Sequence, residues 1–147
     1  MIIKLEPLGE RDVKPVKEII LETLPKIKNV DEEVKKAEKF LYSAKALDNS
    51  VCGCIYINVH NEIWYRLCEL KLLAVKNNDF PNAKLILEEA EKLAIEKGCK
   101  MMQTAVEKED KIHQKFYKKS RFKKVNYFYH LGEVVFIYQK NLTGKGN

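Results

Sequence analysis

The segment between Val75 and Ala83 holds the groups of this sequence that are best suited to bind a phosphate. An apolar, strand-like run ends at Val75, the polar stretch Asn77-Asn78-Asp79-Phe80-Pro81-Asn82 follows, and a helical pattern then begins. The first N–H groups of a helix lack partners within the helix and lie at the positive end of its dipole. A helix that starts directly after a strand therefore predicts an anion site, offered here by the backbone of Asn82, Ala83 and Lys84.

The charge balance also favours an anionic ligand. The chain has 27 Lys and Arg residues against 21 Asp and Glu residues, which gives a formal net charge of +6. Such an excess favours a nucleotide, a phosphate-bearing cofactor or nucleic acid. It is also typical of lysine-rich chains that are simply soluble, so charge alone does not choose the ligand.

Two other kinds of chemistry find no support in the residue pattern. His60, His113 and His130 lie far apart, and none has ligand spacing with a Cys or with another His, so we assign no metal. Ser50 and Ser120 have no visible base partner, so the pattern does not favour a hydrolase.

The cysteines and the amino terminus predict a cytoplasmic protein. The amino terminus is too short and too acidic for a signal peptide, and no apolar run approaches the roughly 20 residues of a membrane span. The cysteines lack the C-x-x-C spacing of a zinc or redox site, and we interpret them as buried, reduced thiols. The four are Cys52, Cys54, Cys68 and Cys99.

The composition predicts one globular domain over residues 1–147, with a frayed tail at 143–147. The chain has 147 residues, of which 46% are hydrophobic and 33% charged, enough to bury a core. No internal repeat, low-complexity segment or linker divides it.

Hydrophobic spacing and turn residues predict the elements that position the candidate phosphate site. We expect Asp12 to cap a first helix that Pro25 ends, and Asp31 to begin a second, short helix. A third helix runs from Pro81 to Gly98, and a fourth lies around 112–117. Strands are predicted at 2–7, 41–46, 51–59, 63–75, 99–106, 125–130 and 134–140.

The resulting order is β-α-α-β-β-β-α-β-α-β-β, an α/β (α+β) chain with a mixed, mostly antiparallel sheet of about seven strands and four helices. Short polar turns join the three strands from 41 to 75 as a meander. A helix of about 15 residues separates the strand that ends at Val75 from the strand at 99–106, so these two are expected to be parallel.

Two stretches resemble the motifs of the GCN5-related N-acetyltransferase (GNAT) superfamily. Leu73-Ala74-Val75, followed by Leu85-Ile86-Leu87-Glu88-Glu89-Ala90, is similar to the family's central strand, phosphate loop and helix. His113 to Val125, with Phe116-Tyr117-Lys118-Lys119 and Phe122-Lys123, is similar to the second motif. The order of elements resembles the family over essentially the whole chain.

The phosphate loop departs from the family pattern Q/R-x-x-G-x-G/A. Asn78 stands at the first position, Pro81 replaces the middle Gly and has no N–H to donate, and only Ala83 is retained. Asp79 places a negative charge where the cofactor pyrophosphate is expected. The loop is therefore degenerate, and weakened binding of the cofactor is expected. In the second motif, Arg121 replaces a Gly, so the helix needs a different cap or a costly left-handed one.

The resemblance implies roles for particular residues. Glu69 matches the general base of some members, and a carboxylate beside an apolar cleft is expected to have a raised pKa. Tyr117 matches the general acid that protonates the CoA thiolate. The implied acetyl-CoA-binding residues are Leu73, Ala74, Val75, Asn78, Asn82, Ala83, Lys84 and Asp110.

The resemblance implies an acyl-CoA-dependent N-acetyltransferase that moves an acetyl group from acetyl-CoA to an unidentified amine by direct attack. The alternative is a non-catalytic GNAT-like module with impaired CoA binding. A third interpretation, nucleic-acid binding, is not favoured. The basic run from Lys115 to Lys124 is expected to be a solvated helix face, and the alternating aromatic residues from Phe122 to Tyr129 predict that one side is core. A homodimer and the acceptor are left open.

Overall fold

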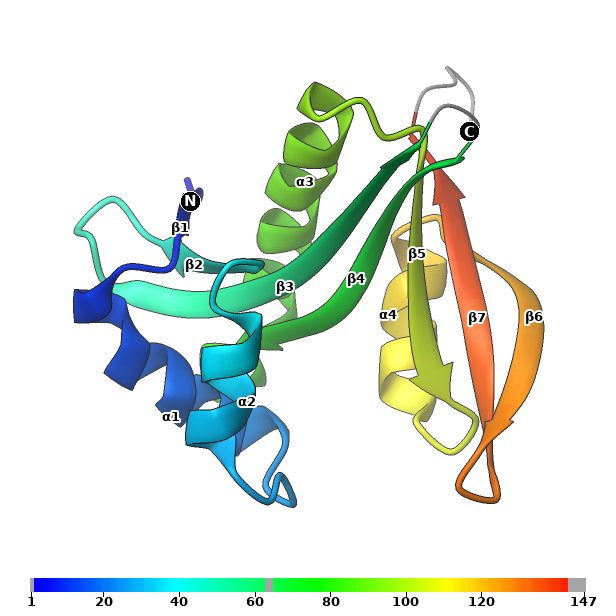
Figure 1. The fold of residues 1–147 in the computed structure, drawn as a ribbon, viewed down its shortest axis with the longest axis horizontal. Coiled ribbons are helices and arrows are strands. Elements are labelled where there is room, and N and C mark those ends of the chain that lie inside the picture. The colour runs from blue at the N-terminus through cyan, green and yellow to red at the C-terminus, as the bar shows by residue number, and fades with distance from the viewer. Residues whose placement is uncertain (1, 63–64, 143–147) are drawn as a thin grey trace. The chain divides into compact units, whose positions relative to one another are not determined.

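The computed structural model describes residues 2–62 and 65–142, so the predicted tail at 143–147 lies outside the described residues (Figure 1). Its elements follow the predicted order, with ends that differ from the prediction by a few residues. They are β1 (Lys4–Pro7), α1 (Val13–Thr23), α2 (Val30–Ala37), β2 (Leu41–Lys45), β3 (Val51–Glu62), β4 (Tyr65–Val75), α3 (Phe80–Glu96), β5 (Met101–Glu107), α4 (Lys111–Lys119), β6 (Lys123–His130) and β7 (Glu133–Asn141).

The seven strands form one mixed sheet in the order β1-β2-β3-β4-β5-β7-β6. Strands β1 and β2, β2 and β3, β5 and β7, and β6 and β7 are antiparallel, whereas β4 and β5 are parallel. The predicted fold class and the predicted parallel crossover from β4 through α3 to β5 are thus confirmed. In the described part of the chain, no helix is long and apolar enough to cross a bilayer.

The chain folds into two compact units. Unit 1 contains residues 1–57 and 72–92, and unit 2 contains residues 58–71 and 93–147. Strands β3 and β4 and helix α3 each contribute residues to both units. The single domain that composition favours stays a prediction.

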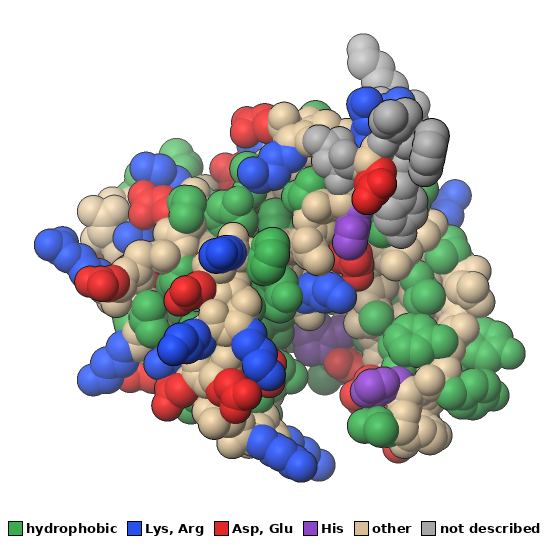
Figure 2. Space-filling view, viewed as in Figure 1, with side chains coloured by type: hydrophobic (Ala, Val, Ile, Leu, Met, Phe, Trp, Pro, Cys, Tyr) green, Lys and Arg blue, Asp and Glu red, His purple; other side chains and the backbone are tan. Residues whose placement is uncertain are grey.

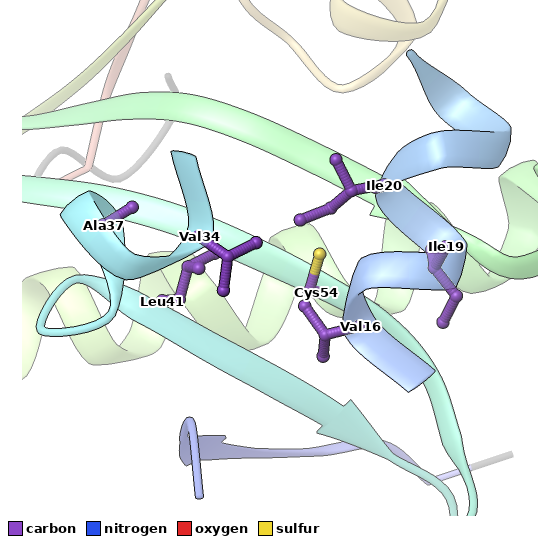
Figure 3. Close-up of a cluster of buried hydrophobic side chains, with 8 residues drawn as sticks. Val16, Ile19, Ile20, Val34, Ala37, Leu41 and Cys54 are labelled. Carbon is purple, nitrogen blue, oxygen red and sulfur yellow. The ribbon is translucent and has the colours of Figure 1, made fainter. Parts of the chain in front are cut away.

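The core of unit 1 forms where two amphipathic helices cover β2 and β3. Residues three and four apart on α1 form one apolar stripe, α2 adds a second stripe, and alternate residues of the strands complete the cluster. Figure 3 shows these side chains pointing toward one another from the four elements. The cluster contains Val16, Ile19, Ile20, Val34, Ala37, Leu41, Cys54 and Ala74, each at most 6% exposed.

Helix α3 packs on the face of β3 opposite to α1 and α2 (Figure 1). Gly53 precedes Cys54 and faces α3, because successive strand residues point to opposite faces. A Cβ at Gly53 would lie 2.6 Å from Ile86 Cδ1 and 2.7 Å from the Ala74 carbonyl oxygen. Only glycine therefore allows α3 and β4 to approach β3 this closely.

The predicted cap of the first helix is wrong. The side chain of Asp12 makes no cap hydrogen bond and instead accepts from Ser43 Oγ at 3.2 Å and pairs with Lys45 Nζ at 3.0 Å. Helix α2 begins at Val30, one residue before the predicted start at Asp31, and Asn29 caps it by accepting a hydrogen bond from the Glu32 N–H. A buried carboxylate stabilises the fold more when it is paired with a cation than when it caps an exposed helix end, which explains the position of Asp12.

In unit 2, α4 lies behind β5 in the view of Figure 1 and contributes Tyr117 to the core. The helix ends at Lys119 and is capped by Ser120, and Arg121 then adopts a left-handed conformation with φ of 73°. This is the costly arrangement that the missing glycine predicts, and it lets the Phe122 N–H bond back to the Tyr117 carbonyl at 2.9 Å.

The prediction that one side of β6 is core is wrong. All eight residues of β6 are exposed, although the sequence alternates as in a half-buried strand. The four cysteines are free thiols. Cys54, Cys68 and Cys99 are buried, whereas Cys52 is only half-buried.

Candidate functional site

The loop between β4 and α3 is built by residues with unusual backbone conformations. Val75 ends β4, and the 3₁₀ turn Lys76–Asn78 follows with left-handed φ values of 59° at Asn77 and 51° at Asn78. Asparagine tolerates this conformation better than most residues, which explains the Asn-Asn pair. The Asn77 N–H donates to Glu22 Oε1 of α1 at 2.5 Å.

Asp79 caps the start of α3. Its Oδ1 accepts from the Asn82 N–H at 3.3 Å, its Oδ2 accepts from Asn82 Nδ2 at 3.1 Å, and its carbonyl accepts from the Ala83 N–H at 2.9 Å. This is the usual geometry of an N-cap aspartate, which satisfies free N–H groups and places a negative charge at the positive helix end.

The loop residues fit a pyrophosphate only if this cap opens. The N–H groups of Asn82 and Ala83, which the sequence predicts as donors, already bond to Asp79. Lys84 is exposed on the first turn of α3 and offers a positive charge there. The predicted residues Leu73, Ala74 and Val75 end β4, and Ala74 and Val75 are buried.

Glu69 of β4 lies in a small charged cluster in unit 2. One oxygen, Oε1, contacts His60 Nε2 of β3, and the other, Oε2, pairs with Lys71 Nζ at 3.1 Å. Both oxygens of the predicted base are therefore already engaged.

The pKa of Glu69 shifts in the direction opposite to the one expected. Burial alone raises it, but the hydrogen bonds and charges of Lys71 and His60 together outweigh burial and hold the pKa below 4.5. The expected raised pKa is wrong because the sequence did not reveal these two partners. Glu69 is consequently ionised at neutral pH. It can therefore accept a proton, although its lowered pKa makes it a weaker base than an ordinary glutamate.

Tyr117 is buried and belongs to a chain of hydroxyl groups. Its phenol bonds to the side chain of Thr104 on β5, and Thr104 Oγ1 donates to the Leu70 carbonyl oxygen at 3.0 Å. Burial raises the pKa of Tyr117 far more than the Thr104 hydrogen bond lowers it, so the phenol stays protonated.

Glu69 and Tyr117 approach the same point of the sheet from opposite faces. The described pairing of β4 with β5 runs from Leu67↔Met101 to Leu70↔Thr104. Leu70, whose carbonyl ends the hydroxyl chain, directly follows Glu69. The side chains of paired residues share a face, so Thr104 directs Tyr117 to one face and Glu69 lies on the other.

Asp110, predicted to contact the cofactor, caps α4. Its Oδ1 accepts from the His113 N–H at 3.0 Å, and its Oδ2 bonds His113 Nδ1 at 2.7 Å. The helix end at Asp110 is thus satisfied in the same way as the helix end at Asp79.

Sequence reasoning missed His60 and Thr104. His60 falls just beyond the predicted strand at 51–59, and its contact with Glu69 depends on the register of the β3–β4 hairpin, which the residue pattern does not contain. Thr104 carries no local signal, since its role depends on the pairing of β4 with β5. Within residues 2–62 and 65–142, no group of three or more His, Cys, Asp or Glu side chains lies close enough to hold a metal.

Comparison with known proteins finds similarity in structure alone. No family model and no curated protein matches this chain. Similar crystal structures include the NatC complex bound to Gag peptide and CoA, with a TM-score of 0.73, 19% identity, and coverage of 97% of this chain and 100% of that chain.

Two further crystal structures agree. PaiA N-acetyltransferase from Thermoplasma acidophilum, in complex with coenzyme A, has a TM-score of 0.69 and 20% identity over 96% of this chain and 99% of its own. An acetyltransferase of the GNAT family from Bacillus cereus ATCC 10987 has a TM-score of 0.74 and 13% identity over 96% and 98% of the two chains. The fold that the sequence resemblance implied is thereby confirmed.

Proposed function

Because this chain has the GNAT fold, we propose that it is an acyl-CoA-dependent N-acetyltransferase that moves an acetyl group from acetyl-CoA to an amine. Unit 2 carries the catalytic pair Glu69 and Tyr117, and unit 1 carries the cofactor-binding residues at the end of β4 and the start of α3. The observation that carries the proposal is the placement of Glu69 and Tyr117 on opposite faces at the Leu70↔Thr104 pair.

This arrangement suits a direct transfer between two substrates. A base on one face of the paired strands β4 and β5 and an acid on the other face are proposed to act on the two ends of the reaction, the attacking amine and the departing thiolate. The amine nitrogen forms a bond to the thioester carbon, the carbon–sulfur bond breaks, and the electron pair stays on sulfur. Glu69 accepts the proton of the amine, directly or through water, and Tyr117 gives its proton to the sulfur.

The protonation state of each of the two residues agrees with its proposed role. Lys71 and His60 keep Glu69 deprotonated at neutral pH, and burial keeps Tyr117 protonated. A backbone N–H near Val75 is proposed to polarise the thioester carbonyl and to stabilise the negative charge that develops on its oxygen in the transition state. In unit 1, Leu73 and Val75 are proposed to bond the pantetheine through their main chain, and Asn78, Asn82, Ala83 and Lys84 to bind the rest of the cofactor. In unit 2, Asp110 is a separate proposed contact.

Release of free CoA thiol with a panel of amines and peptides tests this proposal. We expect release above the hydrolysis rate with at least one acceptor, and a large loss of kcat in Tyr117→Phe with little change in acetyl-CoA binding. Neither thiol release nor a thermal shift with acetyl-CoA in the unaltered protein would contradict it. The cytoplasmic location and the acceptor are parts of the proposal that need their own experiments.

A non-catalytic module is the second candidate, and the capped loop is the observation that favours it. Asp79 and Glu22 already bind the N–H groups of Asn82 and Asn77, and Pro81 has no N–H to donate. Restoring the loop with Pro81→Gly and Asp79→Gly separates the two candidates. A large gain in acetyl-CoA affinity without any acyl transfer would favour the module, whereas a gain accompanied by faster transfer would favour the enzyme.

A further inference from the structure

Strand β6 exposes large apolar side chains that a sheet normally buries. The exposed fraction is 56% at Tyr127, 41% at Phe128 and 71% at Tyr129. β6 is an edge strand, and Figure 2 shows hydrophobic side chains at the surface over β6 and β7, at the right of the view. Contiguous apolar surface of this kind marks a binding site more often than it serves stability.

The exposed tyrosines share one face of the sheet. Tyr127 pairs with Phe136 and Tyr129 with Val134, and the two tyrosine rings are 6.0 Å apart. Lys124 shares this face and places its Nζ 4.1 Å from the centre of the Phe136 ring. We name the following residues the basic–aromatic strip: Lys124, Tyr127 and Tyr129 of β6, together with Lys118 and Lys119 in the last turn of the preceding helix α4.

The stretch of sequence that carries the strip has charge of one sign. From Lys115 to His130 the sequence contains six Lys and Arg residues and no Asp or Glu. In the part of the chain that the structure describes, no ion pair engages any lysine of this stretch. Such a surface attracts a polyanion, and the attraction decreases as salt concentration rises.

The edge of β6 is protected against addition of another strand. The pairing with β7 shifts between Lys124 and Asn126, and Asn126 Oδ1 accepts from the Tyr127 N–H at 2.8 Å, which occupies a backbone donor of the edge. A bulge and edge lysines are devices that prevent strand pairing. The exposed rings therefore suit a ligand that contacts side chains better than a peptide or a second copy that adds to the sheet.

We propose that the basic–aromatic strip binds single-stranded nucleic acid, with its lysines on phosphates and its tyrosines on bases. Aromatic side chains two residues apart on one strand lie about 6–7 Å apart, so each can contact a successive unstacked base. Single strands, unlike duplexes, present base faces to such rings. This binding is independent of acyl transfer, since the strip contains neither Glu69 nor Tyr117.

Fluorescence anisotropy with a labelled 12-nucleotide oligo(U) tests the proposal, with a duplex of equal length and inorganic polyphosphate as the comparison ligands. We expect the single strand to bind more tightly than both, with log K falling against log salt with a slope of about −3 if roughly four phosphates are contacted. Equal binding of polyphosphate would reduce the strip to a charged surface and overturn the assignment.

Substitutions in the strip distinguish the contribution of the aromatic rings to oligo(U) binding from the contribution of the lysine charges. Tyr127→Ala and Tyr129→Ala should each weaken binding roughly 5- to 100-fold, whereas Tyr→Phe at either position should keep the affinity within about twofold. The double variant Lys118→Ala/Lys119→Ala should flatten the salt slope by about 1.4, whereas the matched control Lys35→Ala/Lys36→Ala on α2 should leave it unchanged.

Two results with these variants would also overturn the proposal. The first is Tyr→Ala variants that keep their melting temperature and still bind oligo(U) normally. The second is loss of a dimer in light scattering without loss of oligo(U) binding, which would assign the strip to a second copy. Acetyl-CoA binding should be unchanged in every strip variant, so failure here is distinct from failure of the proposed enzyme.

Discussion

Replacing Asp79 should strengthen the binding of acetyl-CoA while it weakens the start of α3. Asp79 accepts the Asn82 N–H that a pyrophosphate needs, so a bound phosphate must displace a cap worth about 1 kcal/mol. Its charge, in water-like surroundings about 5 Å from a phosphate, adds roughly 1 kcal/mol of repulsion. The two effects together amount to about 2 kcal/mol, or about 30-fold in affinity.

Two substitutions distinguish the effect of the helix cap from the effect of the charge of Asp79. Asp79→Ala removes the cap and the charge and should bind about 30-fold more tightly, whereas Asp79→Ser keeps a cap oxygen and should gain only about 5-fold. Asp79→Ala should also lose about 1 kcal/mol of stability, which Asp79→Ser should largely retain. Titration calorimetry with acetyl-CoA at two salt concentrations and thermal unfolding measure both quantities.

The control is Glu33→Ala, which removes one exposed carboxylate from the first turn of α2 and should leave acetyl-CoA affinity unchanged. High salt should shrink the difference between Asp79→Ser and the unaltered protein, because only the charge is screened. If both Asp79 variants bind acetyl-CoA no better than the unaltered protein while stability falls as expected, Asp79 does not stand in the path of the phosphate and the reasoning is refuted.

Three further outcomes are expected. Activity should fall with decreasing pH only below the ordinary titration range of a glutamate, because the base must be ionised and Lys71 and His60 together lower the pKa of Glu69; a fall in kcat/KM near neutral pH would contradict Glu69 as the base. Thr104→Val should lower the free energy of unfolding in urea by about 1–3 kcal/mol, because it leaves the buried Leu70 carbonyl and the Tyr117 phenol without their hydrogen-bond partner. Thr104→Ser keeps the hydroxyl and should change this free energy little. Equal losses in the two variants would show that packing of the methyl group, and not the hydroxyl, stabilises this position. Gly53→Ala should lower the stability measured by thermal unfolding by about 1–3 kcal/mol, because the new Cβ lies 2.7 Å from a carbonyl oxygen. The control Gly9→Ala, whose Cβ has nothing within 4 Å, should leave stability unchanged. A Gly53→Ala variant with unchanged stability would contradict the close packing of α3 on β3.

The elements of this fold could be predicted because their signals are local. Helix α1 ends at Thr23, shortly before Pro25, as the proline predicts. Gly98 takes the left-handed conformation expected just after α3. The length of α3 was enough to predict that β4 and β5 are parallel.

The electrostatics of the site could not be predicted in the same way. The pKa of Glu69 depends on His60, which reaches it across a hairpin, and the role of Asp12 depends on Lys45 in another strand. Such pairings require the register of the sheet, which residue spacing along one element does not contain. The exposure of β6 likewise follows from its place at the sheet edge, because periodicity shows which residues share a face but not whether anything covers that face.

A crystal soaked with acetyl-CoA tests the central claim most directly, namely that the start of α3 binds the cofactor once Asp79 releases it. The account predicts a pyrophosphate bonded to the N–H group of Asn82, the carboxylate of Asp79 turned away, and pantetheine amides bonded to the main chain of Leu73 and Val75. An acetyl-CoA that binds elsewhere while Asp79 still caps Asn82 would contradict it.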